Sequence, residues 1–134
     1  MLLAHLAVTW TLVGLIWVIQ IVVYPQLRAI EKSGFIAYHF AHCLRIGLLI
    51  APLLAIEGAT AAALLYQGHR ERPFLVGLGL MLLIWLSTLF LQAPLHVRLM
   101  GGRDPEVIRR LIRSNWLRTL AWTARGFLVA SLLK

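Results

Sequence analysis

The sequence predicts an all-α integral membrane protein, built as an up-down four-helix bundle. Three observations support this prediction. The chain has 134 residues, of which 60% are apolar and only 13% are charged, whereas a soluble domain carries about 25% charged residues. The apolar residues occur in long blocks, and a membrane-spanning helix needs ~20 of them. The segments between the blocks are short, and short connections join antiparallel helices.

We expect residues 1–134 to form one domain. The four predicted spans lie at about 2–24, 45–66, 74–95 and 115–133. Two interfacial helical extensions are predicted at about 34–44 and 105–114. Pro25 is expected to end the first span. Asp104 followed by Pro105 is a favourable helix start, because aspartate caps the amino end and proline fits the first turn. The first block lacks a basic leader and a small-residue cleavage site, so we interpret it as a span rather than a signal peptide.

The distribution of basic residues predicts the orientation of the bundle. One side collects Arg28, Lys32, Arg45, Arg98, Arg103, Arg109, Arg110, Arg113 and Arg118. The opposite side holds Arg70, Arg72 and Lys134. Because cytoplasmic loops carry the excess of Lys and Arg, both termini are predicted to be extracytoplasmic. The formal charge of +8 is therefore attributed to topology and lipid headgroups, and we do not expect a nucleic-acid partner.

Each predicted helix carries one stripe of polar side chains at helical spacing, 100° per residue. The stripes are Trp17, Gln20 and Tyr24; His39 and Glu57; Trp85, Thr88, Gln92 and His96; and Asn115, Arg118, Trp122 and Arg125. Polar residues of a membrane bundle are expected to face its interior. The four stripes therefore predict a polar interior.

One tier of this interior is expected to hold Glu57 and Arg125. Counted from the helix ends, Arg125 is the opposite charge that lies at the depth of Glu57. Burying either charge alone would cost ~3 kcal/mol on insertion scales. We predict an intramembrane ion pair, which would either tether the second and fourth helices or form a proton or substrate site.

The second tier is predicted near the cytoplasmic face, where His39, His42 and His96 come together from two helices. Three imidazoles of this kind suit zinc, copper or iron, or the axial positions of a haem. The alternative is that these histidines line the interface or contact a substrate without any cofactor. Cys43 is interpreted as a packing residue, and His5 as a surface group.

A row of small residues on the second helix offers a close packing face. It consists of Gly47, Ala51, Ala55, Ala59 and Ala63. Small residues at every fourth position allow membrane helices to approach closely. The row could serve the bundle itself or a homo-oligomer.

Three motifs resemble the anthrone-oxygenase-like family of small bacterial four-span membrane proteins. They are "VVYPQL" at the end of the first span, "APLHVRLMGG" at the end of the third and "NWLRTLAW" at the start of the fourth. The resemblance implies a location in the bacterial inner membrane. Some members resemble enzymes that oxidise polycyclic anthrones with dioxygen. Carried over by position, the implied site is Tyr24, His96, Asn115 and Arg118.

Three functions remain open on the sequence. The first is a redox enzyme or metal- or haem-binding protein acting on a lipophilic aromatic or quinone-like substrate. Its expected catalytic residues are His42, His96, Asn115 and Arg118, with Gln20, Tyr24, Gln92 and Trp116 contacting the substrate. The second is an oligomeric transporter or proton-coupled carrier that uses Glu57 and Arg125. The third is an accessory subunit of a larger membrane complex.

Overall fold

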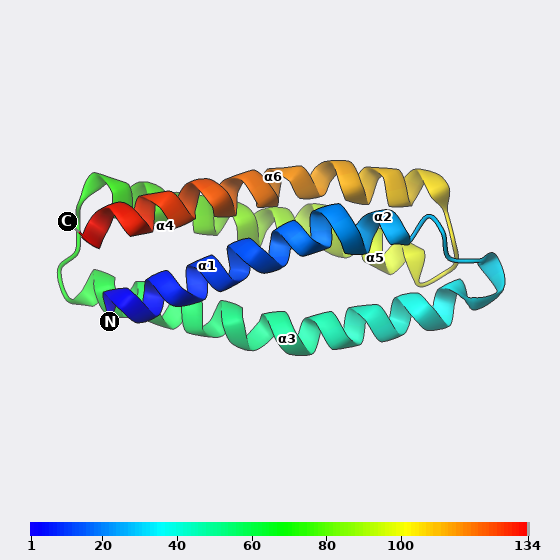
Figure 1. The fold of residues 1–134 in the computed structure, drawn as a ribbon, viewed down its shortest axis with the longest axis horizontal. Helices are drawn as coiled ribbons and strands as arrows, with labels where there is room; N and C mark the ends of the chain where they lie inside the picture. Colours follow the sequence, from blue (N-terminus) through cyan, green and yellow to red (C-terminus); the bar gives the residue numbers. More distant parts are fainter. Residues whose placement is uncertain (134) are drawn as a thin grey trace.

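The computed structural model describes residues 1–133 and is helical almost throughout (Figure 1). In chain order the elements are α1 (Leu2–Val18), η1 (Ile19–Val23), α2 (Tyr24–Gln26), α3 (Lys32–Tyr66), α4 (Arg72–Ser87), η2 (Thr88–Gln92), α5 (Ala93–Leu99), α6 (Pro105–Ala130) and η3 (Ser131–Leu133). α1, η1 and α2 form one continuous rod, as do α4, η2 and α5. The result is the predicted bundle of four antiparallel helices.

α6 lies at the centre of the packing, in contact with α1 on one side and with α4 and α5 on the other. α3 packs mainly against α1 and meets α5 only near the end that carries the α2–α3 loop. The apolar core lies along the inner faces of α1 and α6, where Leu12, Ile16, Ile108 and Leu111 are almost fully buried. Both described chain ends reach the same end of the bundle (Figure 1).

Three of the continuous helices within residues 1–133 are long and apolar enough to cross a membrane. They are Leu2–Gln26, Lys32–Tyr66 and Arg72–Leu99. Three of the four predicted spans are thus apolar enough by composition, and the fourth helix, α6, is not among them. α6 has sufficient length, but polar residues such as Asn115, Arg118 and Arg125 remove its apolar character. These three side chains are buried inside the bundle.

The helices also extend further than predicted. α3 is one unbroken helix of 35 residues, so the expected interfacial extension and span are parts of a single rod that contains Pro52. α6 likewise runs without a break from Pro105 to Ala130. Pro25 does not end the first helix, which continues to Gln26.

Two π-helical segments explain how the first and third rods pass a proline. A proline removes one backbone donor and crowds the carbonyl four residues earlier. That carbonyl belongs to Ile21 in η1 for Pro25, and to Phe90 in η2 for Pro94. The wider turn accommodates the crowding, and π segments of this kind are frequent at functional sites. Both segments carry a buried amide side chain.

Local capping fixes two helix ends. α3 ends in a Schellman motif, in which the amides of Gly68 and His69 donate to the carbonyls of Leu65 and Leu64 at 3.2 and 3.1 Å. Gly68 has a φ of 95°, which glycine adopts without the steric cost of a side chain. Asp104 caps α6 as predicted, because its Oδ1 accepts from the amide of Glu106 at 2.9 Å.

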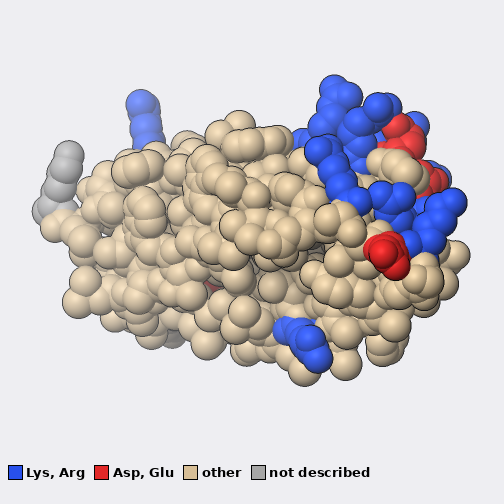
Figure 2. Space-filling model, turned by 45° about the vertical axis from the view of Figure 1, so that its right-hand side comes forward, with Lys and Arg blue, Asp and Glu red and all other residues tan. Residues whose placement is uncertain are grey.

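The surface divides into a charged end and an apolar middle. Figure 2 shows Lys and Arg gathered at one end, with the acidic residues of that end among them, while the rest of this face is mostly uncharged. Large exposed apolar side chains run along the rods, among them Leu48, Phe90 and Phe127. The predicted small-residue row is also on the outside, since Gly47, Ala51, Ala55 and Ala59 are exposed.

A close approach of α1 to α6 gives a stability prediction. A Cβ atom added at Gly126 of α6 would lie 3.2 Å from the ring of Trp10 and 3.3 Å from Val13, both on α1. Replacing Gly126 with leucine should therefore separate α1 from α6 and lower the free energy of unfolding by about 1–3 kcal/mol. Gly79→Leu is the matched control, because its Cβ would meet no atom within 4 Å. Thermal unfolding in detergent measures both; equal melting temperatures would contradict this account of the α1–α6 contact.

Candidate functional site

Arg125 on α6 joins all four rods of the bundle. Its side chain is 1% exposed and Nη1 forms an ion pair with Glu57 of α3. The same nitrogen donates to Thr9 Oγ1 of α1 at 3.1 Å, and Nε donates to the carbonyl of Gly77 on α4 at 3.1 Å. The predicted Glu57–Arg125 pair is thus present, within a larger network.

His5 belongs to this network, and its interpretation as a surface group is wrong. It is fully buried, and its Nε2 accepts from Arg125 Nη2 at 3.0 Å. Because arginine can only donate, the His5 proton lies on Nδ1, which donates to Thr60 Oγ1 at 2.7 Å. Nη2 also reaches Met81 Sδ at 3.5 Å. All five N–H groups of Arg125 therefore have acceptors inside the bundle.

Glu57 is less completely satisfied than its partner. Its Oε1 accepts from Arg125 and, at 3.4 Å, from Trp122 Nε1. Its Oε2 is buried and has no hydrogen-bond partner within residues 1–133. The closed network around Arg125 favours a structural tether in this tier.

A cavity of about 410 Å³ lies between α3 and the η2–α5 segment, in the bundle half nearer the charged end. Most of its wall is apolar, from residues such as Ile46, Ile50 and Leu54. Its polar lining consists of Tyr24, His42, Cys43, Thr88, Gln92, His96, Arg118 and Trp122. Gly47, which is exposed, also lines the cavity, so the cavity opens toward the outer face of α3.

Arg118 brings a buried positive charge to this cavity. It is 7% exposed, and no carboxylate of residues 1–133 lies within ion-pair distance of it. It donates to Thr88 Oγ1 at 3.1 Å, to Tyr24 Oη at 3.2 Å and from Nε to Asn115 Oδ1 at 2.9 Å. Tyr24 Oη is also 3.0 Å from His96 Nε2. Since the tyrosine oxygen accepts from Arg118, its hydroxyl proton is free to donate to His96.

Four further residues of the predicted site have different positions relative to the cavity. Asn115 Nδ2 donates to Gln20 Oε1 at 2.8 Å, so Asn115 and Gln20 orient Arg118 from behind. Gln92 lines the cavity and is fixed by Ser87 and Ser114 at 3.0 and 3.2 Å. Trp116 is 41% exposed and does not line the cavity.

Three potential metal ligands converge at the cavity wall: His39 and Cys43 of α3 and His96 of α5. His39 Nε2 is 3.4 Å from His96 Nδ1, and Cys43 Sγ is 3.5 and 3.6 Å from these two nitrogens. The 3.4 Å between the two nitrogens is long for a hydrogen bond, and His39 Nε2 also lies 3.3 Å from the carbonyl oxygen of His96. Tetrahedral coordination with metal–nitrogen bonds of ~2.0–2.1 Å and metal–sulfur bonds of ~2.3 Å places two nitrogens ~3.4 Å apart and a nitrogen and a sulfur ~3.6 Å apart.

The same distances favour a single ion over a haem. Two imidazoles on opposite faces of a haem would hold their nitrogens about 4 Å apart, given metal–nitrogen bonds of ~2 Å. The 3.4 Å between the nitrogens of His39 and His96 is too short for that arrangement. Cys43 also lies beside both nitrogens, where the porphyrin would have to pass.

His42, which the sequence placed with the metal ligands, is not among the three converging atoms. Its ring centre lies 6.2 Å from those of His39 and His96. It lines the cavity, and its buried Nε2 has no partner in the described chain. His42 is therefore placed to meet a molecule in the cavity.

The sequence signal for Cys43 was its spacing from His39. Residues four apart share a helix face, so a histidine and a cysteine at this spacing present both ligands to one neighbour. His5 and Thr9 have the same spacing on α1, and both face Arg125.

Comparison of the chain with protein-family models, with curated proteins and with solved structures finds no match.

The Arg125 network predicts an asymmetric response to substitution. Arg125→Met leaves Glu57 buried without its ion-pair partner, so the free energy of unfolding should fall by about 3–5 kcal/mol. The double variant Glu57→Met/Arg125→Met should recover part of this loss, because a buried pair replaced by apolar residues is often tolerated. Recovery stays incomplete because His5 and Thr9 lose their donor.

Unfolding in detergent measures these effects, and Arg45→Met is the control. Arg45 is exposed on α3 and forms none of the ion pairs within residues 1–133, so its loss should change stability by less than about 0.5 kcal/mol. If Arg125→Met were as stable as Arg45→Met, the network would not hold the bundle together.

Proposed function

We propose that this chain is an integral membrane metalloprotein with a redox function. A copper ion bound by His39, Cys43 and His96 would face a cavity that admits a lipophilic aromatic or quinone-like substrate. The observation that carries the proposal is the convergence of one thiol and two imidazole nitrogens at the separations of tetrahedral coordination. A thiolate with two imidazoles suits zinc and copper. Met100, whose thioether is a further soft donor, lines the same cavity, which favours copper.

Membrane residence is supported by three apolar rods that are long enough to cross a bilayer. α6 would cross with them as the fourth span, because its arginine and asparagine side chains at 115, 118 and 125 face the bundle rather than lipid. Intramembrane polar groups are tolerated when they are buried in this way. The positively charged end in Figure 2 would then be cytoplasmic, with both described chain ends on the opposite side. We place the protein in the bacterial inner membrane.

A substrate would enter the cavity sideways from the bilayer. The cavity lies where α3 separates from the η2–α5 segment, and its wall is mostly apolar. An aromatic ring would fit among Ile46, Ile50 and Leu54. Its oxygen atoms would meet the polar end, where one N–H of Arg118 Nη1 has no acceptor in the described chain.

The side chains around the metal ligands have separable roles in this proposal. Arg118 would stabilise negative charge on a substrate oxygen, because it is buried without a carboxylate partner among residues 1–133. His42 would exchange a proton with the substrate. A metal at His96 Nδ1 would place the proton of that imidazole on Nε2, which would then donate to Tyr24 and fix the ring orientation.

The resemblance to the anthrone-oxygenase-like family suggests one version of the reaction, in which dioxygen oxidises a polycyclic anthrone to the corresponding quinone and water. The residues implied by that resemblance divide here into cavity-lining groups, Tyr24, His96 and Arg118, and the positioning residue Asn115. The transporter alternative rests on Glu57, whose Oε2 lacks a partner within residues 1–133. The saturated donors of Arg125 favour a structural role for that pair.

The metal proposal predicts about one copper ion per chain. Protein purified without chelators, or reloaded with copper, should show a thiolate–metal absorption band and a matching metal content by mass spectrometry. His39→Ala, Cys43→Ala and His96→Ala should each lower the affinity by at least ~100-fold, since second-shell changes alone cost 10–100-fold.

Two histidine variants control for general loss of imidazole. His42→Ala should retain the metal, because its ring is outside the three-atom set, and His69→Ala should retain it because that histidine pairs with Glu71 on the surface. Zinc bound at the same stoichiometry without colour would remove the redox function and keep the metal site. A chain that binds neither ion would refute the proposal.

The cavity proposal predicts that Gly47 controls access. A Cβ atom there would meet no atom within 4 Å, so Gly47→Phe can fold normally while its ring occupies the cavity mouth. Binding of a decyl-substituted benzoquinone, measured by quenching of tryptophan fluorescence, to which the cavity-lining Trp122 contributes, should weaken at least tenfold while metal content stays unchanged. Gly14→Phe, in open space on α1, is the matched control and should bind the quinone normally. Equal binding by both variants would exclude entry beside Gly47.

A further inference from the structure

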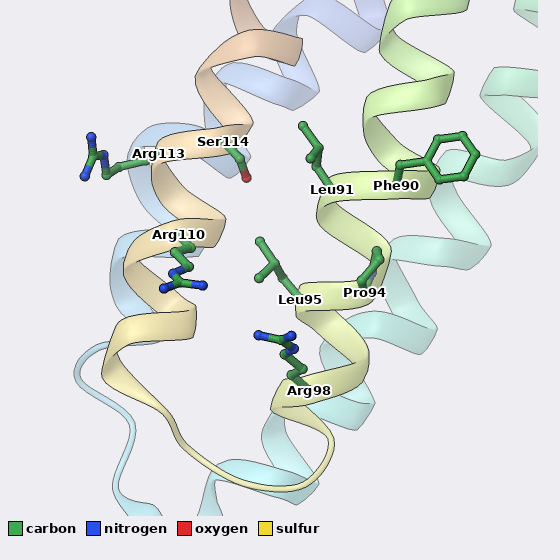
Figure 3. Close-up of a pocket in the computed structure, with 8 residues that line it drawn as sticks. All are labelled: Phe90, Leu91, Pro94, Leu95, Arg98, Arg110, Arg113 and Ser114. Atoms are coloured by element: carbon green, nitrogen blue, oxygen red, sulfur yellow. The ribbon is translucent and has the colours of Figure 1, made fainter.

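We propose that a groove between α5 and α6 binds an anionic phospholipid. The groove has a volume of about 450 Å³ and lies on the outer surface at the positively charged end. Figure 3 shows the side chains of Leu91 and Leu95 between the two rods. The guanidinium groups of Arg98 and Arg110 lie in the same space, nearer to the loop that joins α5 to α6.

The arginines of the groove keep unsatisfied donor capacity. Arg98 and Arg113 form no ion pair with any carboxylate of residues 1–133. Arg110 pairs with Glu106 through Nε at 3.0 Å, and its two terminal nitrogens have no recorded acceptor in the described chain. Arginine binds phosphate through pairs of N–H groups. The end of the groove nearer to the α5–α6 loop therefore has the chemistry of a phosphate site.

The part of the groove farther from the α5–α6 loop is apolar. Leu91 and Leu95 lie one helical turn apart and are at least partly exposed. Leu91 is seven residues from Arg98, which corresponds to ~10 Å along the helix axis. The groove thus changes from cationic to apolar along the long axis of the bundle, in the direction from the charged end toward the middle.

This arrangement, with a cationic end followed by an apolar wall, favours one kind of ligand. A free phosphate would leave the leucine wall uncovered, and a lipid without net charge would leave the charge of Arg98 without a counter-charge. An anionic phospholipid meets both, with its phosphate between Arg98 and Arg110 and an acyl chain along Leu91 and Leu95. Anionic lipids are attracted to juxtamembrane Lys and Arg at the cytoplasmic leaflet. The inference rests on the proposed membrane residence and not on the metal site.

The bound lipid would also support the segment that carries His96. Behind the groove, Gln92 Nε2 donates to Ser114 Oγ at 3.2 Å, which joins η2 to α6. Ser114 lines the groove, and His96 lies two residues before Arg98 on α5. A phosphate bridging Arg98 and Arg110 would add a link between α5 and α6 next to this one.

Native mass spectrometry and thermal unfolding of the full chain test this site. Protein delipidated in a neutral detergent should bind one phosphatidylglycerol per chain and melt several degrees higher with it, and phosphatidylcholine should do neither. Arg98→Gln/Arg110→Gln should weaken phosphatidylglycerol binding by roughly 25-fold, about fivefold for each arginine. Leu95→Gln should weaken it with the arginines intact.

Arg28→Gln/Arg109→Gln is the matched control, since it removes the same charge from the same end outside the groove. It should retain lipid binding. Equal loss in the two double variants would overturn the proposal in favour of non-selective surface attraction. Stabilisation by glycerol phosphate equal to that by phosphatidylglycerol would overturn the lipid assignment. Lipid retention by a chain that binds no metal would still support it, so this proposal and the metal proposal can fail separately.

Discussion

The bundle depends on the accommodation of one buried cation. Arg125 is buried, and its five N–H groups need acceptors inside the bundle because an unpaired buried donor is costly. Those acceptors come from α1, α3 and α4: His5 and Thr9, Glu57, and the Gly77 carbonyl with the Met81 sulfur. One side chain therefore fixes the relative position of four rods. α6, too polar to be recognised as a span by composition, is held at the centre for the same reason.

The second arginine of α6 has a different environment, and the difference separates structure from function. Arg118 lies seven residues from Arg125, which is two helical turns. It has no carboxylate partner among residues 1–133 and borders a cavity. The bundle thus has a closed tier, where the charge is neutralised internally, and an open tier, where a buried positive charge faces space for a ligand. The two π segments contribute Gln20 and Gln92 to the open tier. Each segment lies just before a proline, Pro25 or Pro94, of the same continuous helix.

Much of this arrangement could be predicted from residue spacing. The helical period of the polar stripes predicted that Tyr24, His96 and Arg118 face the bundle interior, and depth counting paired Glu57 with Arg125. The same reasoning missed His5 and Cys43. His5 with Thr9 and His39 with Cys43 share a helix face at a spacing of four residues, but this spacing does not say what the face meets, and a lone cysteine resembles a packing residue. Each becomes significant only when a second rod places Arg125 or His96 beside it.

The sequence by itself determined the helical class, the four rods, the direction of the charge gradient and the two tiers of polar residues, because periodicity and hydropathy act along one chain. Tertiary structure decided which atoms meet. Cys43 rather than His42 joins His39 and His96, because its Sγ lies 3.5 and 3.6 Å from the facing nitrogens of these two histidines. The cavity exists because α3 packs against α1 and is separated from η2. Helix crossing and separation depend on packing between distant segments, which no local pattern encodes.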